Sequence, residues 1–154
     1  MTGEVPPSVN LGRLTADLRS LGLVRSRHIA LANPDRSDGA PGQVATQPLY
    51  VPQLVMADGL PHDVVFLATT LNDVFAVDPD SGGIYWHLNV HPAPSAFASL
   101  PIRFGVHATP VISPDLSAIY VAFNDLQGSY VAALNLTTGQ VESQVAVSAR
   151  GRAA

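Results

Sequence analysis

Two segments of this chain repeat each other, and this repeat limits the folds available to it. Residues 64–90 have the sequence VVFLATTLNDVFAVDPDSGGIYWHLNV, and residues 118–147 have the sequence AIYVAFNDLQGSYVAALNLTTGQVESQVAV. Each segment runs as a strand, a short polar break, a strand, a turn headed by Asp or Asn with Gly, and a strand. A repeated unit that cannot bury its own apolar face predicts stacked β units rather than a one-piece catalytic domain.

The register of the repeat is constant across its second hairpin. The separation between Ala76 and Ala133 equals the separation between Gly82 and Gly139. The separation between the first strands of the two units is three residues shorter, so the first hairpin differs in length. Loop length that varies between strands of constant spacing is typical of stacked β units.

Composition excludes several classes of function. The chain has 154 residues, 47% hydrophobic, and no Cys, which excludes disulfides, thiolate metal sites and Cys nucleophiles. No apolar run reaches the roughly 18 residues of a transmembrane helix. Within residues 44–147 the only base is Arg103, and an acidic body of this kind disfavours nucleic acid as a partner. The acids of that region are Asp58, Asp63, Asp73, Asp78, Asp80, Asp115, Asp125 and Glu142.

The first part of the chain has a different pattern from the repeat. Residues 1–41 are interpreted as an N-terminal arm and loop, in which four leucines fall at helical spacing. A short helix and a strand followed by a turn both remain open for this arm. No signal peptide is visible in it. The helically spaced residues are Leu11, Leu14, Leu18 and Leu21.

The remaining sequence predicts strands in two successive units. In residues 42–90 we expect strands at Val44–Met56, Val64–Thr69, Asp73–Val77 and Ile84–Val90. The first is expected to be edge-like because prolines interrupt it, and the second to be buried on both faces because it is nearly all apolar. In residues 107–147 we expect the matching strands at His107–Ser113, Ala118–Phe123, Ser129–Leu134 and Gln140–Val147. Residues 148–154 are expected to form a disordered tail.

The turn of the first unit carries a motif that can be named. Ala76, Asp78, Gly82 and Trp86 match the pattern Ala-x-Asp-x-x-x-Gly-x-x-x-Trp, with Gly83 beside Gly82. This pattern resembles the repeat of pyrroloquinoline-quinone-type β-propellers, the quinoprotein alcohol dehydrogenase-like repeats. The resemblance covers about residues 42–147. The second copy keeps Ala133, Thr138 and Gly139 but has Asn135 in place of the Asp and Ser143 in place of the Trp.

The resemblance implies an all-β fold of antiparallel four-stranded propeller-type blades, preceded by a short helical or irregular arm. It also implies that the tryptophan docks one blade onto the next, and that the motif residues are structural. Two blades, about 42–90 and about 107–147, cannot close a ring of 4–8 blades. We therefore expect a fragment of a longer propeller, or a module completed by association. The predicted blade-docking residues are Ala76, Asp78, Gly82, Gly83, Trp86, Ala133, Asn135 and Gly139.

Candidate chemical sites are weaker than the structural motif. His87 and His91 lie four residues apart, but nearby prolines argue against the shared helix face that a metal pair would use. The segment Asp78–Gly83 has a faint resemblance to a calcium loop, but it lacks the bidentate Glu at the twelfth position, so a hairpin turn is favoured. No Gly-x-Ser-x-Gly elbow is present. We expect no metal site and no catalytic residue.

Two functions from different classes follow from these patterns. The first is a non-catalytic propeller-repeat module, a scaffold or binding surface whose partners are further blades or other copies of the chain. The second is the N-terminal part of a pyrroloquinoline-quinone-dependent dehydrogenase, in which the quinone and calcium would be the cofactors. The first is favoured because no cofactor site is evident. Family resemblance implies a periplasmic or secreted protein.

Overall fold

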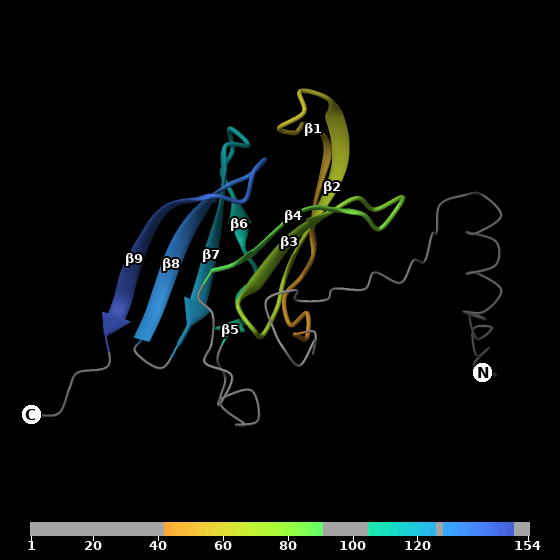
Figure 1. The fold of residues 1–154 in the computed structure, drawn as a ribbon. Coiled ribbons are helices and arrows are strands. Elements are labelled where there is room, and N and C mark those ends of the chain that lie inside the picture. The colour runs from red at the N-terminus through yellow and green to blue at the C-terminus, as the bar shows by residue number, and fades with distance from the viewer. Residues whose placement is uncertain (1–41, 91–104, 126–127, 150–154) are drawn as a thin grey trace, which may run out of the picture.

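The computed structural model describes residues 42–90, 105–125 and 128–149, which form two antiparallel β-sheets (Figure 1). We call the sheet β1-β2-β3-β4 blade one and the sheet β5-β7-β8-β9, in which β6 also pairs with β7, blade two. Consecutive strands pair throughout blade one, which is the arrangement of a propeller blade. The predicted fold class, antiparallel four-stranded blades, is confirmed, and the two blades do not close a ring. The strands are β1 (Leu49–Val55), β2 (Pro61–Ala68), β3 (Asp73–Val77), β4 (Ile84–Asn89), β5 (Gly105–Val106), β6 (Val111–Ile112), β7 (Ala118–Asn124), β8 (Gly128–Asn135) and β9 (Val141–Ala149).

The first strand of each blade is interrupted. In blade one this confirms the expectation that prolines interrupt the strand at Val44–Met56, and in blade two the segment expected at His107–Ser113 is divided in the same way. In blade one, Val44 forms an isolated bridge with Thr69, and the ladder resumes at Leu49. In blade two, the interruption separates β5 from β6. Pro48 and Pro110 lie at these interruptions, where a residue without an N–H cannot donate into the ladder.

The pairing registers of the two blades are equivalent position by position. Val44 pairs with Thr69 in blade one, and Val106 pairs with Phe123 at the same place in blade two. The other strands match in the same way: Ala76 lies opposite Trp86, and Ala133 lies opposite Ser143. The second copy of the repeat therefore folds in the register that the sequence predicted, with Ser143 at the tryptophan position.

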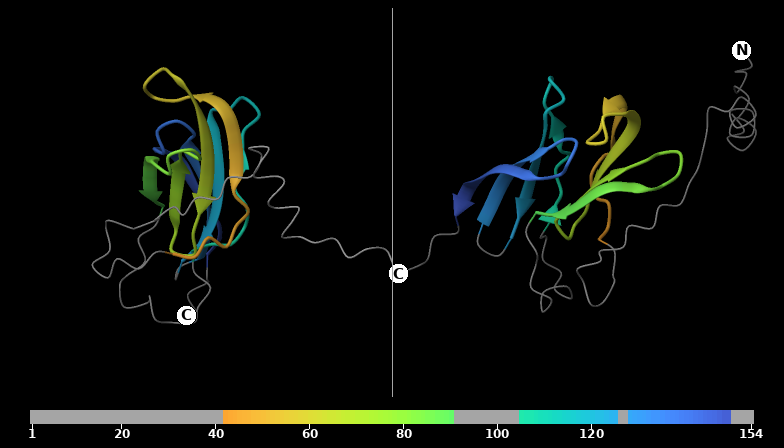
Figure 2. Two further views of the ribbon diagram at one scale, coloured as in Figure 1. Left: turned by 90° about the vertical axis from the view of Figure 1, so that its right-hand side faces the viewer. Right: turned by 45° about the horizontal axis from the view of Figure 1, so that its top comes forward.

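The main hydrophobic core lies between the two blades, which pack face to face (Figures 1 and 2). Side chains at alternate positions of the central strands supply it, as the twofold period of a strand requires. This shared core is what joins the two sheets into one body. Blade one contributes Phe66, Val74, Ala76 and Trp86, and blade two contributes Ile119, Val121, Phe123 and Leu134.

Blade one also buries apolar side chains on its other face. Leu67, Phe75 and Val77 form a second, smaller cluster there, with Val65 packed against it. All five residues of β3 are buried, so this strand is covered on both faces. The sequence predicted burial on both faces for β2. This is confirmed for its C-terminal part, where Val64, Phe66, Leu67 and Ala68 are buried. β2 starts at Pro61, three residues before the predicted start.

Two predicted segments extend beyond the described residues. The N-terminal arm, residues 1–41, lies outside them, and so does most of the predicted tail. The predicted tail starts at residue 148, whereas β9 continues through Ala149. In the part of the chain that the structure describes, no helix has the length and apolar character needed to span a membrane.

Candidate functional site

The interface between the blades is centred on Trp86 of β4. Its indole Nε1 donates a hydrogen bond of 3.1 Å to the backbone carbonyl of Leu136 in blade two. The ring packs at 5.8 Å between centroids from Phe66 and keeps only 9% of its surface exposed. A large aromatic side chain whose polar N–H is satisfied when buried suits this position.

Gly139 provides the surface against which the Trp86 ring lies. A Cβ added at Gly139 would fall 2.5 Å from Cε3 of Trp86, closer than real contacts allow. The backbone of Gly139 also has a φ of 73°, a conformation that L side chains rarely adopt. Both the space and the backbone conformation therefore favour glycine at this turn.

The turns headed by Asp78 and Asn135 have the same hydrogen bonds. The N–H of Gly82 donates to the Asp78 carbonyl at 2.8 Å, and the N–H of Gly139 donates to the Asn135 carbonyl at 2.9 Å. Oδ1 of Asp78 accepts the N–H groups of Asp80 and Ser81. Oδ1 of Asn135 accepts the N–H groups of Thr137 and Thr138. A side chain that accepts hydrogen bonds from its own turn explains why Asp and Asn both fit.

The turn of blade one differs from that of blade two in carrying a charge. The Ser81 hydroxyl donates to Oδ2 of Asp78 at 2.6 Å. This hydrogen bond, with the N–H bonds from Asp80 and Ser81, lowers the pKa of Asp78 below its ordinary value. Gly82 has a φ of 75°, whereas Gly83 has no positive φ, so Gly82 supplies the left-handed turn conformation.

The two motif alanines lie at equivalent places with different surroundings. Ala76 is fully buried and pairs with Trp86. Ala133 keeps 8% of its surface exposed and pairs with Ser143, which is itself exposed. Ala76 and Trp86 of blade one and the turn of blade two thus meet in one interface, while Ala133 lies on the far side of blade two.

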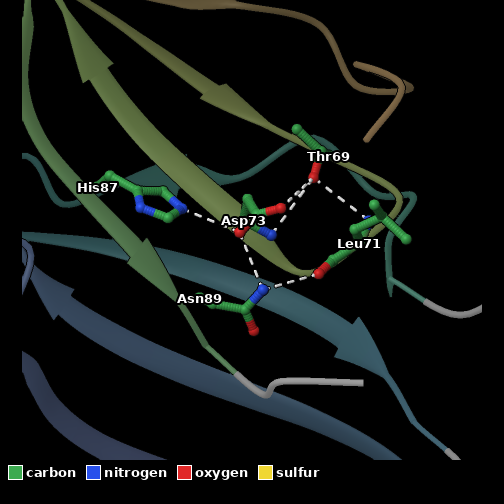
Figure 3. Close-up of polar contacts among 5 residues, drawn as sticks. All are labelled: Thr69, Leu71, Asp73, His87 and Asn89. Carbon is green, nitrogen blue, oxygen red and sulfur yellow. Dashed lines mark hydrogen bonds and ion pairs between the residues drawn. The ribbon is translucent and has the colours of Figure 1, made fainter. Parts of the chain in front are cut away.

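A buried polar cluster at the end of blade one was missed by sequence analysis (Figure 3). Asp73 is only 1% exposed, and its Oδ1 lies 2.9 Å from Nε2 of His87 and 2.9 Å from Nδ2 of Asn89. Its Oδ2 accepts a 3.4 Å hydrogen bond from the Thr69 hydroxyl. Asn89 also donates to the Leu71 carbonyl at 3.0 Å, which joins the cluster to the β2–β3 hairpin.

This cluster is confined to blade one. The equivalents of Thr69 and Asp73 in blade two are Phe123 and Tyr130, whose rings stack at 5.4 Å between centroids. His87 in turn stacks on Phe75 at 4.4 Å. The cluster could have been predicted from the register of β3 and β4, because Asp73 pairs with Asn89 across these strands. In the sequence alone, His87 stands out only through its spacing from His91.

The structure gives the predicted chemical alternatives no added support. His87 contacts Asp73, and His91 lies outside the described residues. Among residues 42–90, 105–125 and 128–149, no three His, Asp or Glu side chains gather in an arrangement that could hold a metal ion. The Asp78 carboxylate accepts hydrogen bonds from its own hairpin turn.

An exposed polar network links β1 and β2 of blade one. Oδ2 of Asp63 accepts a 2.8 Å hydrogen bond from the Tyr50 hydroxyl, and Oδ1 accepts bonds from the backbone and side chain of Gln53. The bond from the Gln53 backbone, followed by that from Tyr50, lowers the pKa of Asp63. Gln53 has a positive φ of 52° at a break in the β1–β2 register, so these bonds hold an irregular strand in place.

Comparison with known proteins gives matches in structure alone. No protein-family model matches the sequence, and no curated protein matches it. BamB from Moraxella catarrhalis matches 55% of this chain and 21% of its own, with 19% identity and a TM-score of 0.38. Quinohemoprotein alcohol dehydrogenase from Comamonas testosteroni matches 54% of this chain and 12% of its own, with 15% identity and a TM-score of 0.41.

The chain thus matches less than a quarter of the length of either structure. The blade topology and the equivalent registers of its own two sheets are what establish the fold. The described part of this chain is a pair of β-propeller-type blades, as its resemblance to the quinoprotein repeat predicted.

Proposed function

We propose that this chain is a non-catalytic propeller-repeat module that acts as a scaffold or binding surface. The observation that carries the proposal is the joint between the blades, where Trp86 of one sheet bonds to Leu136 in the turn of the next. In this proposal the motif residues hold blades together, and none of them acts on a substrate. The proposed docking residues are Ala76, Asp78, Gly82, Gly83, Trp86, Ala133, Asn135 and Gly139.

The contacts of these residues support a structural role. Trp86 is the only tryptophan of the chain and is buried between the blades. The carboxylate of Asp78 and the amide of Asn135 are both engaged by the N–H groups of their own turns. Side chains used in this way are not free to bind a substrate.

The alternative is a pyrroloquinoline-quinone-dependent dehydrogenase of which this chain is one part. The quinone is an anion with several carboxylates, and such ligands are held best by cationic side chains. The described ranges contain no Lys and no Arg. A quinone bound by these residues would therefore lack the charge partners that favour it, which supports the scaffold over the dehydrogenase.

The proposed partners are further blades or other copies of the chain. The acidic composition of residues 44–147 favours neither nucleic acid nor another polyanion. Burial of apolar sheet surface is the expected basis of such an association, because it needs no charged contact.

Gel filtration with added cofactor tests the proposal. The purified chain is mixed with pyrroloquinoline quinone and Ca²⁺, and the absorbance of the quinone is followed through the column. The scaffold proposal predicts that the quinone elutes apart from the protein. Stoichiometric co-elution of the quinone with the folded chain would overturn it in favour of the dehydrogenase.

A further inference from the structure

The face of blade two that points away from blade one carries exposed apolar side chains. We define the outer face of blade two by two rows of paired residues that cross its strands. Val111, Tyr120 and Val145 are 63%, 45% and 64% exposed. Both rows are free of charged side chains. The first row is Val111, Tyr120, Ala133 and Ser143, and the second is Ala122, Val131 and Val145.

The same two rows exist in blade one, where they form the joint between the blades. The first row there ends in Ala76 and Trp86, and the second contains Val74 and Leu88. Every member of both rows belongs to the core shared by the blades or packs against it. The positions that blade one uses to dock onto blade two thus recur in blade two, where all of them except Val131 and Ala133 are exposed. The full rows of blade one are Leu49, Phe66, Ala76 and Trp86, and Ala68, Val74 and Leu88.

The existing joint also defines the surface that receives such a face. Blade two offers the side chains of Ile119, Val121 and Leu134, and the Leu136 carbonyl beside Gly139. A receiving surface therefore combines an apolar sheet face with a turn headed by Asp or Asn that contains Gly.

Among the described residues of a second copy of this chain, no such receiving surface is available. The receiving face of its blade two is already covered by blade one. The opposite face of its blade one is buried as well, with Leu67, Phe75 and Val77 at most 8% exposed. A separate blade with a free inner face is therefore the occupant that fits.

We propose that the outer face of blade two binds a further four-stranded blade whose inner face resembles that of blade two. This deepens the proposed function and rests on it, because it names the surface and the partner of the scaffold. Ser143 stands where Trp86 anchors the existing joint, so the second joint lacks the aromatic anchor. Replacing Ser143 by Trp is then expected to strengthen it.

Single cysteines provide the test, because the chain has none of its own. Val145→Cys reports on the outer face, and Gln144→Cys is the control, since neighbouring residues of a strand point to opposite faces. Each substitution is placed in the natural chain and in an extended chain, in which residues 1–149 are followed by a second copy of residues 90–149. The rate of maleimide labelling is measured for both substitutions in both chains.

Docking predicts that the Val145→Cys thiol in the first copy is labelled about tenfold more slowly in the extended chain, while the Gln144→Cys thiol is labelled equally in both. Ser143→Trp in the first copy is expected to slow labelling of the Val145→Cys thiol further. Equal labelling of this thiol in both chains would overturn the proposal. Its protection in the natural chain, growing with protein concentration, would also overturn the proposal by assigning the face to a second copy.

The experiments distinguish failure of the docking proposal from failure of the proposed function. Emission from Trp86 in the natural chain reports whether the first joint is intact, and quinone co-elution reports a cofactor site. An intact first joint without protection of the Val145→Cys thiol would reject the docking surface alone. Quinone co-elution with protection of that thiol would reject the non-catalytic role alone.

Discussion

Trp86 and Leu136 are joined across the boundary between the two blades by a 3.1 Å hydrogen bond from indole Nε1 to a backbone carbonyl. The residues lie 50 positions apart in the chain, and this contact links β4 to the turn that follows β8. The ring buries apolar surface and the N–H fixes its orientation, so one side chain supplies both area and direction to the joint.

Substitution of Trp86 separates these two contributions. Trp86→Phe keeps much of the apolar area but leaves the Leu136 carbonyl without its donor, which is expected to lower the free energy of unfolding by about 1–3 kcal/mol. Trp86→Ala also opens a cavity and is expected to cost about 3–5 kcal/mol. Urea denaturation followed by circular dichroism measures both. Equal costs for the two variants would contradict a role for the ring itself.

Gly139 and Gly59 form a matched pair, because both have a positive φ but only Gly139 contacts Trp86. Gly59 has a φ of 79° and open space around it. Gly59→Ala is therefore expected to cost about 1–2 kcal/mol of backbone strain alone. Gly139→Ala adds the displacement of the ring, so it should cost more and shift the Trp86 emission to longer wavelength. Similar losses of stability and unchanged emission in both variants would show that the ring does not lie on Gly139.

The buried Asp73 depends on its donors. His87→Leu removes one of them, and the loss of a hydrogen bond to a buried carboxylate is expected to cost about 1–3 kcal/mol. His87→Gln keeps a side-chain donor and should cost less. Thermal unfolding of the two variants and the natural chain measures the difference. If His87→Leu is at least as stable as His87→Gln, the hydrogen bond to Asp73 contributes no net stability.

Acid is expected to destabilise the chain through carboxyls whose pKa is lowered on folding. The pKa of Asp78 is lowered from 3.8 by the Ser81 hydroxyl, and that of Asp115 by the Ser113 and Ser117 hydroxyls. A carboxyl of this kind stabilises the fold above its unfolded pKa of 3.8, and this contribution is lost as the pH falls through the lower folded pKa.

Asp78→Asn tests this pH dependence with little change of structure, because Asn135 already occupies the equivalent turn. Asp63→Asn, outside the repeated turn, serves as a comparison. Each variant should lose less of its free energy of unfolding than the natural chain when the pH is lowered from neutrality to below 3.8. The measurement is urea denaturation at a series of pH values. An unchanged pH profile in both variants would show that ionisation of these carboxyls does not contribute to the pH dependence of the free energy of unfolding.

The strands and the repeat could be predicted from the sequence because local signals agree there. Alternating and continuous apolar runs, together with the Asp and Asn turns, located β2, β3, β4, β7 and β8 to within a few residues. Each of these signals acts within one strand or one turn, so it can be recognised in the sequence without knowledge of the tertiary contacts.

The polar cluster and the exact bounds of the first strands could not be predicted with the same ease. The interruption at Pro48 is expected from the residue itself, because proline has no N–H to donate, but the resumption of the ladder at Leu49 depends on the pairing of β1 with β2. The Asp73–His87 contact joins residues 14 positions apart and is defined only once the register of β3 and β4 is known. The exposure of Val145 depends on which face of blade two is covered by blade one, and the sequence pattern does not specify that face.

Trp86 is the central contact between the two blades, and hydrogen exchange at its indole tests this role most directly. The chain has one tryptophan, so its spectrum contains a single indole N–H signal. Docking on Leu136 predicts an N–H that exchanges slowly in the natural chain and rapidly in Gly139→Ala. An indole N–H in the folded natural chain that exchanges as fast as that of free tryptophan would contradict the joint between the blades.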